Sequence, residues 1–244
     1  MLKFLISTIV VSGMLLASCA VAGLVMYLPF DDGKGKVAKD ITGNGNDGTI
    51  NGDAQWVDGK FGGALEFTNR NSWVEPTLEK KWWNENLKSF SVVMWVKSND
   101  MNQPIFFGSQ DPGDARLYLA VKDGFWNMGI QDKSWGGGHQ GVLAKADKEW
   151  HAIALTMDND TATLYINGEK TITKKYSKYT MNKKPLIGAL NKHDGIGYHL
   201  TGIMDEVGVW DRVLTQADVK ANMERGFAVS PEGRLATVWG DIKK

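Results

Sequence analysis

The sequence has almost no cysteine and no excess of either charge. Cys19 is the single cysteine among 244 residues, so the chain cannot close an intramolecular disulfide. Lysine plus arginine and aspartate plus glutamate each number 28, which leaves no basic surplus for binding phosphate groups. These absences exclude a fold stabilised by intramolecular disulfides, and we expect no nucleic-acid partner.

The usual catalytic patterns are also missing. No nucleophile elbow, phosphate-binding loop or dinucleotide fingerprint occurs, and the four histidines lack zinc-ligand spacing. A two-carboxylate glycosidase needs acids that face one cleft, whereas the adjacent Asp205 and Glu206 should point to opposite faces of a strand. We therefore predict that the chain is not an enzyme. A glycoside hydrolase or polysaccharide lyase remains the alternative, because acids distant in sequence can meet in space.

The N-terminal residues have the pattern of an export signal. A short positive start is followed by an apolar run over residues 4–16 and by small residues up to Ala22, which predicts a signal peptide over residues 1–22. Two alternatives stay open. Residues 16–19 resemble a bacterial lipobox, which would lipidate Cys19, and the apolar character continues to Leu28, as in an uncleaved anchor. We expect a secreted or cell-envelope protein that contacts a membrane only through such an anchor or lipid.

The rest of the sequence alternates like a β protein. Phe90, Val92, Met94 and Val96 should share one strand face, and Asn167-Gly168 between two apolar runs predicts a tight hairpin. One helix is predicted after a capping box at residues 215–218, ending near residue 225. We expect an all-β, two-sheet antiparallel β-sandwich (jelly roll) over residues 23–228, with one short C-terminal helix and a tail over residues 229–244.

Several segments in order resemble the laminin-G-like jelly rolls of the concanavalin A-like lectin/glucanase class. They are an opening strand with an acidic turn, a Gly/Asn-rich loop, a second strand entry, two sandwich strands and a closing strand. Their residues are 27–33, 40–49, 59–67, 90–96, 164–168 and 202–210. The resemblance implies a sandwich that binds carbohydrate or another extracellular surface ligand, although fold alone does not settle function.

The same resemblance implies a structural calcium ion that joins the opening turn, the Gly/Asn loop and the closing strand. Calcium prefers six to eight oxygen ligands. Strict alternation would place Asp205 on one face with Ile203, Val207 and Val209, and a carboxylate on an apolar face needs a partner. The alternative is that these residues only cap turns. The predicted ligands are Asp31, Asn46 and Asp205, with carbonyls of Gly45 or Gly48 and with Asp40 in reserve.

Ten tryptophans are many for this length, and one of them lies in a Gly-rich polar loop without strand alternation. This residue, Trp135, is followed by His139 and Gln140. Flat rings beside hydrogen-bonding groups suit sugar faces. We therefore predict a ligand contact at Trp135, His139 and Gln140, while a ring that simply covers the sandwich edge is the competing interpretation.

Overall fold

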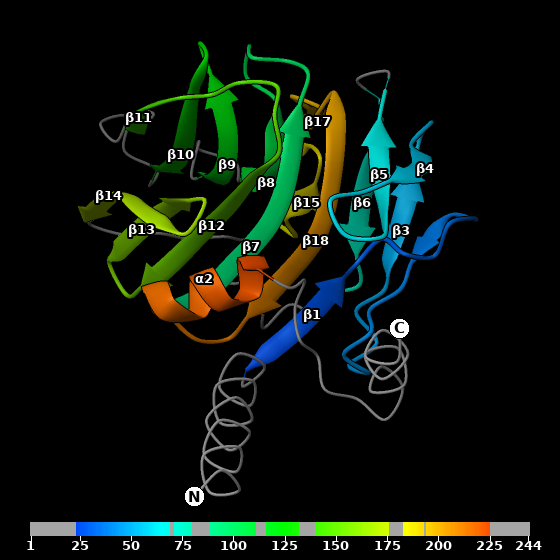
Figure 1. Ribbon diagram of the computed structural model, residues 1–244, viewed down its shortest axis with the longest axis horizontal. Coiled ribbons are helices and arrows are strands. Elements are labelled where there is room, and N and C mark those ends of the chain that lie inside the picture. Colours follow the sequence, from blue (N-terminus) through cyan, green and yellow to red (C-terminus); the bar gives the residue numbers. More distant parts are fainter. Residues whose placement is uncertain are drawn as a thin grey trace, which may run out of the picture.

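The computed structural model describes residues 23–68, 71–79, 88–110, 116–131, 140–175, 183–192 and 194–224. The predicted signal peptide, Cys19 and the tail over residues 229–244 lie outside these ranges. Within them the chain forms two sheets that pack as a sandwich (Figure 1). Among the described residues, no helix is long and apolar enough to cross a bilayer. The predicted all-β sandwich with one short helix is confirmed.

Sheet A contains eight strands in the order β14-β13-β12-β7-β18-β5-β4, and β1 pairs with β18 beside β5. Every pair in it is antiparallel. The strands are β1 (Leu24–Leu28), β4 (Gln55–Asp58), β5 (Gly63–Phe67), β7 (Ser89–Ser98), β12 (His151–Asp158), β13 (Thr161–Ile166), β14 (Glu169–Lys175) and β18 (Gly202–Trp210). The closing strand β18 therefore lies inside the sheet, between β7 on one side and β5 and β1 on the other.

Sheet B contains ten strands, eight of them in the order β11-β10-β9-β8-β15-β6-β3-β2. Its strands are β2 (Val37–Ala38), β3 (Gly48–Asn51), β6 (Trp73–Pro76), β8 (Ile105–Gln110), β9 (Arg116–Lys122), β10 (Phe125–Gln131), β11 (Gln140–Lys145), β15 (Leu186–Ile187), β16 (Leu190–Lys192) and β17 (Gly195–Gly197). The hairpin β16–β17 joins the sheet through one parallel bridge from β16 to β8.

Alternation along the strands builds the core between the sheets. On β7, Phe90, Val92, Met94 and Val96 point into the core, as the sequence predicts, and on β10 Trp126 and its alternate neighbours do the same. Full burial of such side chains contributes about 1.5–3 kcal/mol each. A large apolar core thus stabilises the domain without disulfides.

The helix α2 (Gln216–Glu224) covers the side of sheet A that faces away from sheet B (Figure 1). Its Val219 and Met223 pack with Val93, Ala152 and Ala154 of sheet A in a second apolar cluster. The predicted capping box is present: Thr215 Oγ1 accepts a hydrogen bond from Asp218 N at 3.1 Å, and Asp218 Oδ2 accepts one from Thr215 N at 2.9 Å. Residues beyond Glu224, where the helix was predicted to stop, lie outside the described ranges.

A β-bulge interrupts the expected alternation of side chains along β18. Asp205 pairs with Trp95 and Gly208 with Val93, so two residues of β18 lie opposite one residue of β7. Glu206 adopts a left-handed φ of 54°. Val207 and Val209 consequently belong to the core, whereas Asp205 lies with Trp95 on the outer face of sheet A. The prediction that Asp205 shares a face with Val207 and Val209 is therefore wrong.

The bulge also brings two neighbouring carboxylates to one side of the sheet. Glu206 accepts a hydrogen bond from the hydroxyl of Tyr27, whose ring belongs to the outer cluster under α2. Both Asp205 and Glu206 are buried. The expectation that these two acids point to opposite faces is therefore wrong, because the extra residue of a bulge interrupts the two-residue period of a strand.

Candidate functional site

The Gly/Asn-rich loop over residues 41–47 is organised by one carboxylate. Asp40 Oδ1 accepts hydrogen bonds from Tyr27 N at 3.0 Å and from Thr42 N at 3.1 Å and Thr42 Oγ1 at 2.8 Å. Its Oδ2 accepts one from Asn46 N at 2.9 Å. Asp47 Oδ1 in turn accepts Asp40 N at 2.8 Å. Four donors on one buried carboxylate hold the loop against β1, which is the turn-capping role left open above.

Two amide side chains of this loop are tied to the backbone of β1. Asn44 Nδ2 donates to the carbonyl oxygens of Leu24 at 3.2 Å and of Val25 at 2.9 Å, and Asn46 Nδ2 donates to that of Val25 at 2.8 Å. Carbonyl oxygens only accept hydrogen bonds, so the nitrogen of each amide must face β1.

The loop and β1 form the walls of a polar pocket of about 320 Å³. We call it the N-terminal pocket. The described residues that line it are Gly23, Leu24, Val25, Asn44, Asn46, Glu79 and Asp211. Its volume lies at the lower end of the range for small-molecule sites, about 300–1,000 Å³. The lining thus combines the residues at the start of β1, two amides and two carboxylates, from four separate segments of the chain.

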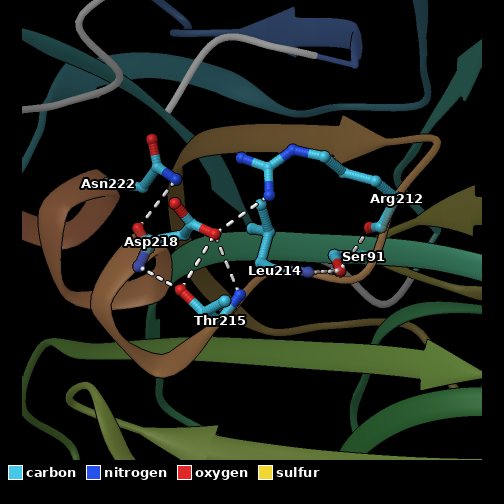
Figure 2. Close-up of polar contacts among 6 residues, drawn as sticks. All are labelled: Ser91, Arg212, Leu214, Thr215, Asp218 and Asn222. Atoms are coloured by element: carbon cyan, nitrogen blue, oxygen red, sulfur yellow. Dashed lines mark hydrogen bonds and ion pairs between the residues drawn. The ribbon is translucent and has the colours of Figure 1, made fainter. Parts of the chain in front are cut away.

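Asp211 is held at the pocket by the segment that leads into α2. Its backbone N donates to Gly23 O at 2.9 Å. Figure 2 shows how buried Ser91 fixes the next residues: its Oγ donates to Arg212 O at 2.8 Å and accepts Leu214 N at 2.9 Å. Arg212 Nη1 then pairs with Asp218 at 2.9 Å. The helix cap therefore also positions one wall of the pocket.

A second acidic cluster lies at the turn between β4 and β5. Gly63 N donates to Asp31 Oδ1 at 2.8 Å, and Phe61 N donates to Asp205 Oδ2 at 3.0 Å. Glycines make this approach possible, because a Cβ on Gly59 would lie 2.6 Å from Asp205 Oδ2 and one on Gly62 would lie 2.5 Å from Asp31 Oδ1. Two of the predicted metal ligands therefore meet the same turn.

Asp205 is the most perturbed group of this cluster. It is fully buried, and its Oδ1 has no hydrogen-bond partner among the described residues. Burial raises the pKa of Asp205 to about 8; the hydrogen bond from Phe61 N opposes the shift, and the charge of Glu206 adds to it. A buried carboxylate with an unsatisfied oxygen is costly unless a proton or a cation neutralises it.

The six predicted calcium ligands thus fall into two groups. Asp40 and Asn46 lie at the Gly/Asn loop, where Asp40 already accepts four hydrogen bonds, and Asp31 and Asp205 both contact the β4–β5 turn. Gly45 lies in the loop at a φ of 77°, and Gly48 begins β3. In the described ranges no three or more His, Cys, Asp or Glu residues form a group placed to hold a metal ion. Calcium therefore remains a prediction.

The predicted ligand contacts at Trp135 and His139 lie outside the described residues. Gln140 is described only as the first residue of β11, paired with Met128. Sequence reasoning missed Asn44, although it belongs to the Gly/Asn motif, and it missed Glu79 and Asp211. These two acids carry no local signal, since the first follows β6 and the second follows β18, and only the fold brings them together.

The fold and part of the sequence match known proteins. The sequence model described as the concanavalin A-like lectin/glucanases superfamily matches residues 69–220. No curated protein sequence matches the chain. Among solved structures, domain 4 of AbnA, a GH43 extracellular arabinanase from Geobacillus stearothermophilus, in complex with arabinotriose, is similar with a TM-score of 0.61 and 21% identity, over 81% of this chain and 97% of that one.

Two clostridial toxin structures are also similar. The binding domain of Paraclostridial Mosquitocidal Protein 1 matches with a TM-score of 0.64 and 18% identity, over 83% of this chain and 52% of that one. Botulinum neurotoxin type C, whose cell entry is dependent upon interaction with two ganglioside molecules, matches with a TM-score of 0.63 and 12% identity, over 84% of this chain and 51% of that one. The chain thus spans about half the length of these toxin chains.

At these identities the structural likeness shows the fold, a jelly roll shared with binding domains. The sequence match is stronger evidence of family membership than the structural likeness, because it covers more than half of the 244 residues. It confirms the predicted resemblance to the concanavalin A-like lectin/glucanase class. The chain belongs to the concanavalin A-like lectin/glucanases superfamily.

Proposed function

We propose that this protein is a non-catalytic, extracellular binding module that holds a carbohydrate in the N-terminal pocket. The observation that carries the proposal is the pocket itself. Its amide and carboxylate groups converge on a space of about 320 Å³. A few polar groups fixed by a rigid scaffold are the usual means of recognising a hydroxyl-rich small molecule. The similar structures support this class of ligand, since one is a complex with arabinotriose and another is named for ganglioside interaction.

Binding is tested by NMR titration of the full chain with arabinotriose and with the positives of a glycan array. We expect shifts at the amides of residues 23–25 and at the side-chain amides of Asn44 and Asn46. Asp211→Ala should weaken binding about tenfold, because a hydrogen bond to a charged group contributes about 1.5–3 kcal/mol. No described residue donates a hydrogen bond to the Asp211 side chain, so the fold should persist.

The matched control for this test is Glu149→Ala, which removes an exposed acid that does not line the pocket. It should leave the affinity unchanged. The proposal fails if no glycan binds. It also fails if the NMR shifts map to residues outside the pocket while Asp211→Ala binds with the affinity of the parent protein.

A glycoside hydrolase is the second candidate, and one observation favours it: two carboxylates, Glu79 and Asp211, line the same pocket. Retaining and inverting glycosidases both use such a pair. Reducing-sugar release from mixed polysaccharides separates the two functions. We expect no release by the parent protein. Release that Glu79→Gln or Asp211→Asn abolishes would establish the enzyme instead.

We further propose that the β4–β5 turn binds a structural calcium ion through Asp31 and Asp205. The unpartnered Oδ1 of Asp205 supports this, since an oxygen ligand of that kind suits calcium and the ion would neutralise the buried charge. When bound, the ion would link the opening turn to the closing strand.

The calcium proposal is tested by thermal unfolding of chelator-treated protein. Calcium at 100 times its Kd should stabilise the parent by about 2.7 kcal/mol. Asp205→Asn should abolish this gain, while in chelator it should unfold at or above the temperature of the parent, because it no longer buries an ionisable carboxyl. Asp160→Asn, at an exposed turn, serves as the control. An unchanged melting curve in calcium would rule the ion out.

A further inference from the structure

The first described residue, Gly23, lies directly against the carboxylate of Asp211. The two are also backbone neighbours, because Asp211 N donates to Gly23 O at 2.9 Å and the adjacent residues Leu24 and Trp210 pair between β1 and β18. A Cβ built on Gly23 would lie 2.2 Å from Asp211 Oδ1. The carboxylate oxygen therefore occupies the space that glycine leaves open beside its Cα.

The α-nitrogen of Gly23 is close to the same oxygen. It is bonded to the same Cα as that Cβ position, and two atoms bonded to one tetrahedral carbon lie about 2.5 Å apart. The nitrogen therefore lies within about 5 Å of Asp211 Oδ1. No described residue donates a hydrogen bond to the Asp211 side chain, which is exposed. At this separation a positive charge on the nitrogen and the carboxylate would stabilise each other.

Removal of the predicted signal peptide would place such a charge on Gly23. In the unprocessed chain the nitrogen is a neutral peptide N–H. Cleavage after Ala22 by a signal peptidase breaks the C–N bond between the two residues. The oxygen of one water molecule becomes part of the Ala22 carboxylate, and both of its protons end on the Gly23 nitrogen. The product is an α-ammonium group, which is mostly protonated at neutral pH.

We infer that export processing creates an ion pair between the α-ammonium of Gly23 and the carboxylate of Asp211, which fastens the start of β1 to the segment between β18 and α2. Among the described strands, β1 pairs with β18 alone, so its first residue would fray unless it is held. Gly23 and Asp211 both line the N-terminal pocket, so processing completes one of its walls. The inference takes the extracellular location from the proposed function and does not depend on the ligand.

Two other charged side chains are described near this pair. The Cγ of Arg212 lies 3.4 Å from the Cβ position of Gly23, and its guanidinium pairs with Asp218 at 2.9 Å. Glu79 lines the same pocket as Asp211. Arg212 opposes a positive charge on the Gly23 nitrogen and Glu79 favours it, so the contribution of Asp211 must be measured by changing Asp211 alone.

The first step is tested by secreting the full chain from a bacterial host and determining its N-terminus by mass spectrometry. We expect a chain that begins at Gly23 with a free amine. Any other start overturns the inference, because no ammonium then forms at Gly23. A lipidated Cys19 and a chain that keeps residues 1–22 are two such results. Neither result bears on carbohydrate binding, which the glycan titration tests separately.

The ion pair itself is tested by NMR on the exported protein, with its glycines labelled with a stable carbon isotope. The signal of the Gly23 Cα is followed as its amine loses a proton in alkaline solution. Asp211→Asn should lower the midpoint of this titration by about 0.5 in pH, because the ammonium loses a nearby negative charge. Glu149→Gln removes an exposed acid outside the pocket lining and is the matched control. No change for Asp211→Asn, or an equal change for the control, overturns the inference.

Stability gives a second readout with a defined sign. A chain that begins at Ala22, released from a tag by a protease, carries its ammonium about 3.8 Å farther along the backbone. At about pH 6.5, Asp211→Asn should raise the unfolding constant about threefold in the chain that begins at Gly23 and less than about 1.5-fold in the longer one. The pair holds the proton more tightly in the folded state, so this difference should vanish as the amine is deprotonated above about pH 9. An equal effect in both chains, or one that persists in alkali, overturns the inference.

Discussion

At the scale of single residues, one carboxylate decides whether the pocket exists. Asp40 is 9% exposed and accepts one hydrogen bond from Tyr27 of β1 and three from Thr42 and Asn46 of the Gly/Asn loop. The loop has little apolar surface to hold it, since Asn44 and the glycines beside it are exposed. Its shape therefore depends on polar contacts that converge on Asp40.

Asp40→Ala should lower the free energy of unfolding by about 2–4 kcal/mol, because it leaves the backbone amides of Tyr27 and Asn46 without their acceptor. Urea denaturation followed by tryptophan fluorescence measures this loss. Asp194→Ala, which removes an exposed ion pair with Lys192, should cost about 1 kcal/mol or less. Equal losses in the two variants would contradict the role given to Asp40.

At the scale of elements, the cap of α2 couples the helix to the pocket. Asp218 accepts hydrogen bonds from Thr215 and pairs with Arg212, one residue from Asp211 (Figure 2). Burial alone would raise the pKa of Asp218, but the hydrogen bonds from Arg212 and Thr215 together outweigh it and lower that pKa below its ordinary value. The ionised cap therefore stabilises the folded state.

The contribution of Asp218 should depend on pH with a defined sign. Because its folded pKa is lowered, the contribution is complete above the unfolded pKa of about 3.9 and is lost as pH falls through the folded value. Asp218→Asn should be less stable than the parent at pH 6, and the difference should shrink below about pH 4. Urea unfolding at several pH values measures it.

Ser91→Ala is the control for this pH series. Ser91 is buried and cannot ionise, yet it holds the same segment through Arg212 O and Leu214 N. Its loss of stability should stay constant from pH 7 to pH 3. A stability difference for Asp218→Asn that is equally constant over this range would show that the carboxylate contributes no charge to the cap.

At the scale of the whole molecule, the sandwich depends on a strand that comes late in the sequence. β18 pairs with β7 along one edge and with β5 and β1 along the other (Figure 1). It thus joins strands from the beginning and the middle of the chain. It also carries the bulge that places Asp205 and Glu206 on the outer face and leads to Asp211.

A chain that ends before β18, at Thr201, should therefore lack a cooperative unfolding transition, because sheet A loses its central strand and the core loses Met204, Val207 and Val209. Circular dichroism and urea denaturation check this. The companion truncation after Glu224, which keeps every described element, should retain the transition. A cooperative, native-like fold in the shorter chain would contradict this account of β18.

Local patterns in the sequence determined much of the fold. The two-residue period of β7 identified its core face, the capping box located the start of α2, and Asn167-Gly168 formed the predicted hairpin between Ile166 and Glu169. Each of these depends on residues within a few positions of one another, so the chain needs no distant partner to reveal them.

Tertiary structure alone decided the site. The bulge at Glu206 depends on the register between β18 and β7, which alternation within one strand cannot reveal. The N-terminal pocket needs β1, the Gly/Asn loop, Glu79 and Asp211, which the fold brings together from across almost 190 positions of sequence. Sequence alone determined that the chain would be a sandwich with a Gly/Asn loop. Which acids face that loop was decided by long-range pairing, because hydrogen bonding between distant strands fixes the relative position of segments that carry no mark of each other.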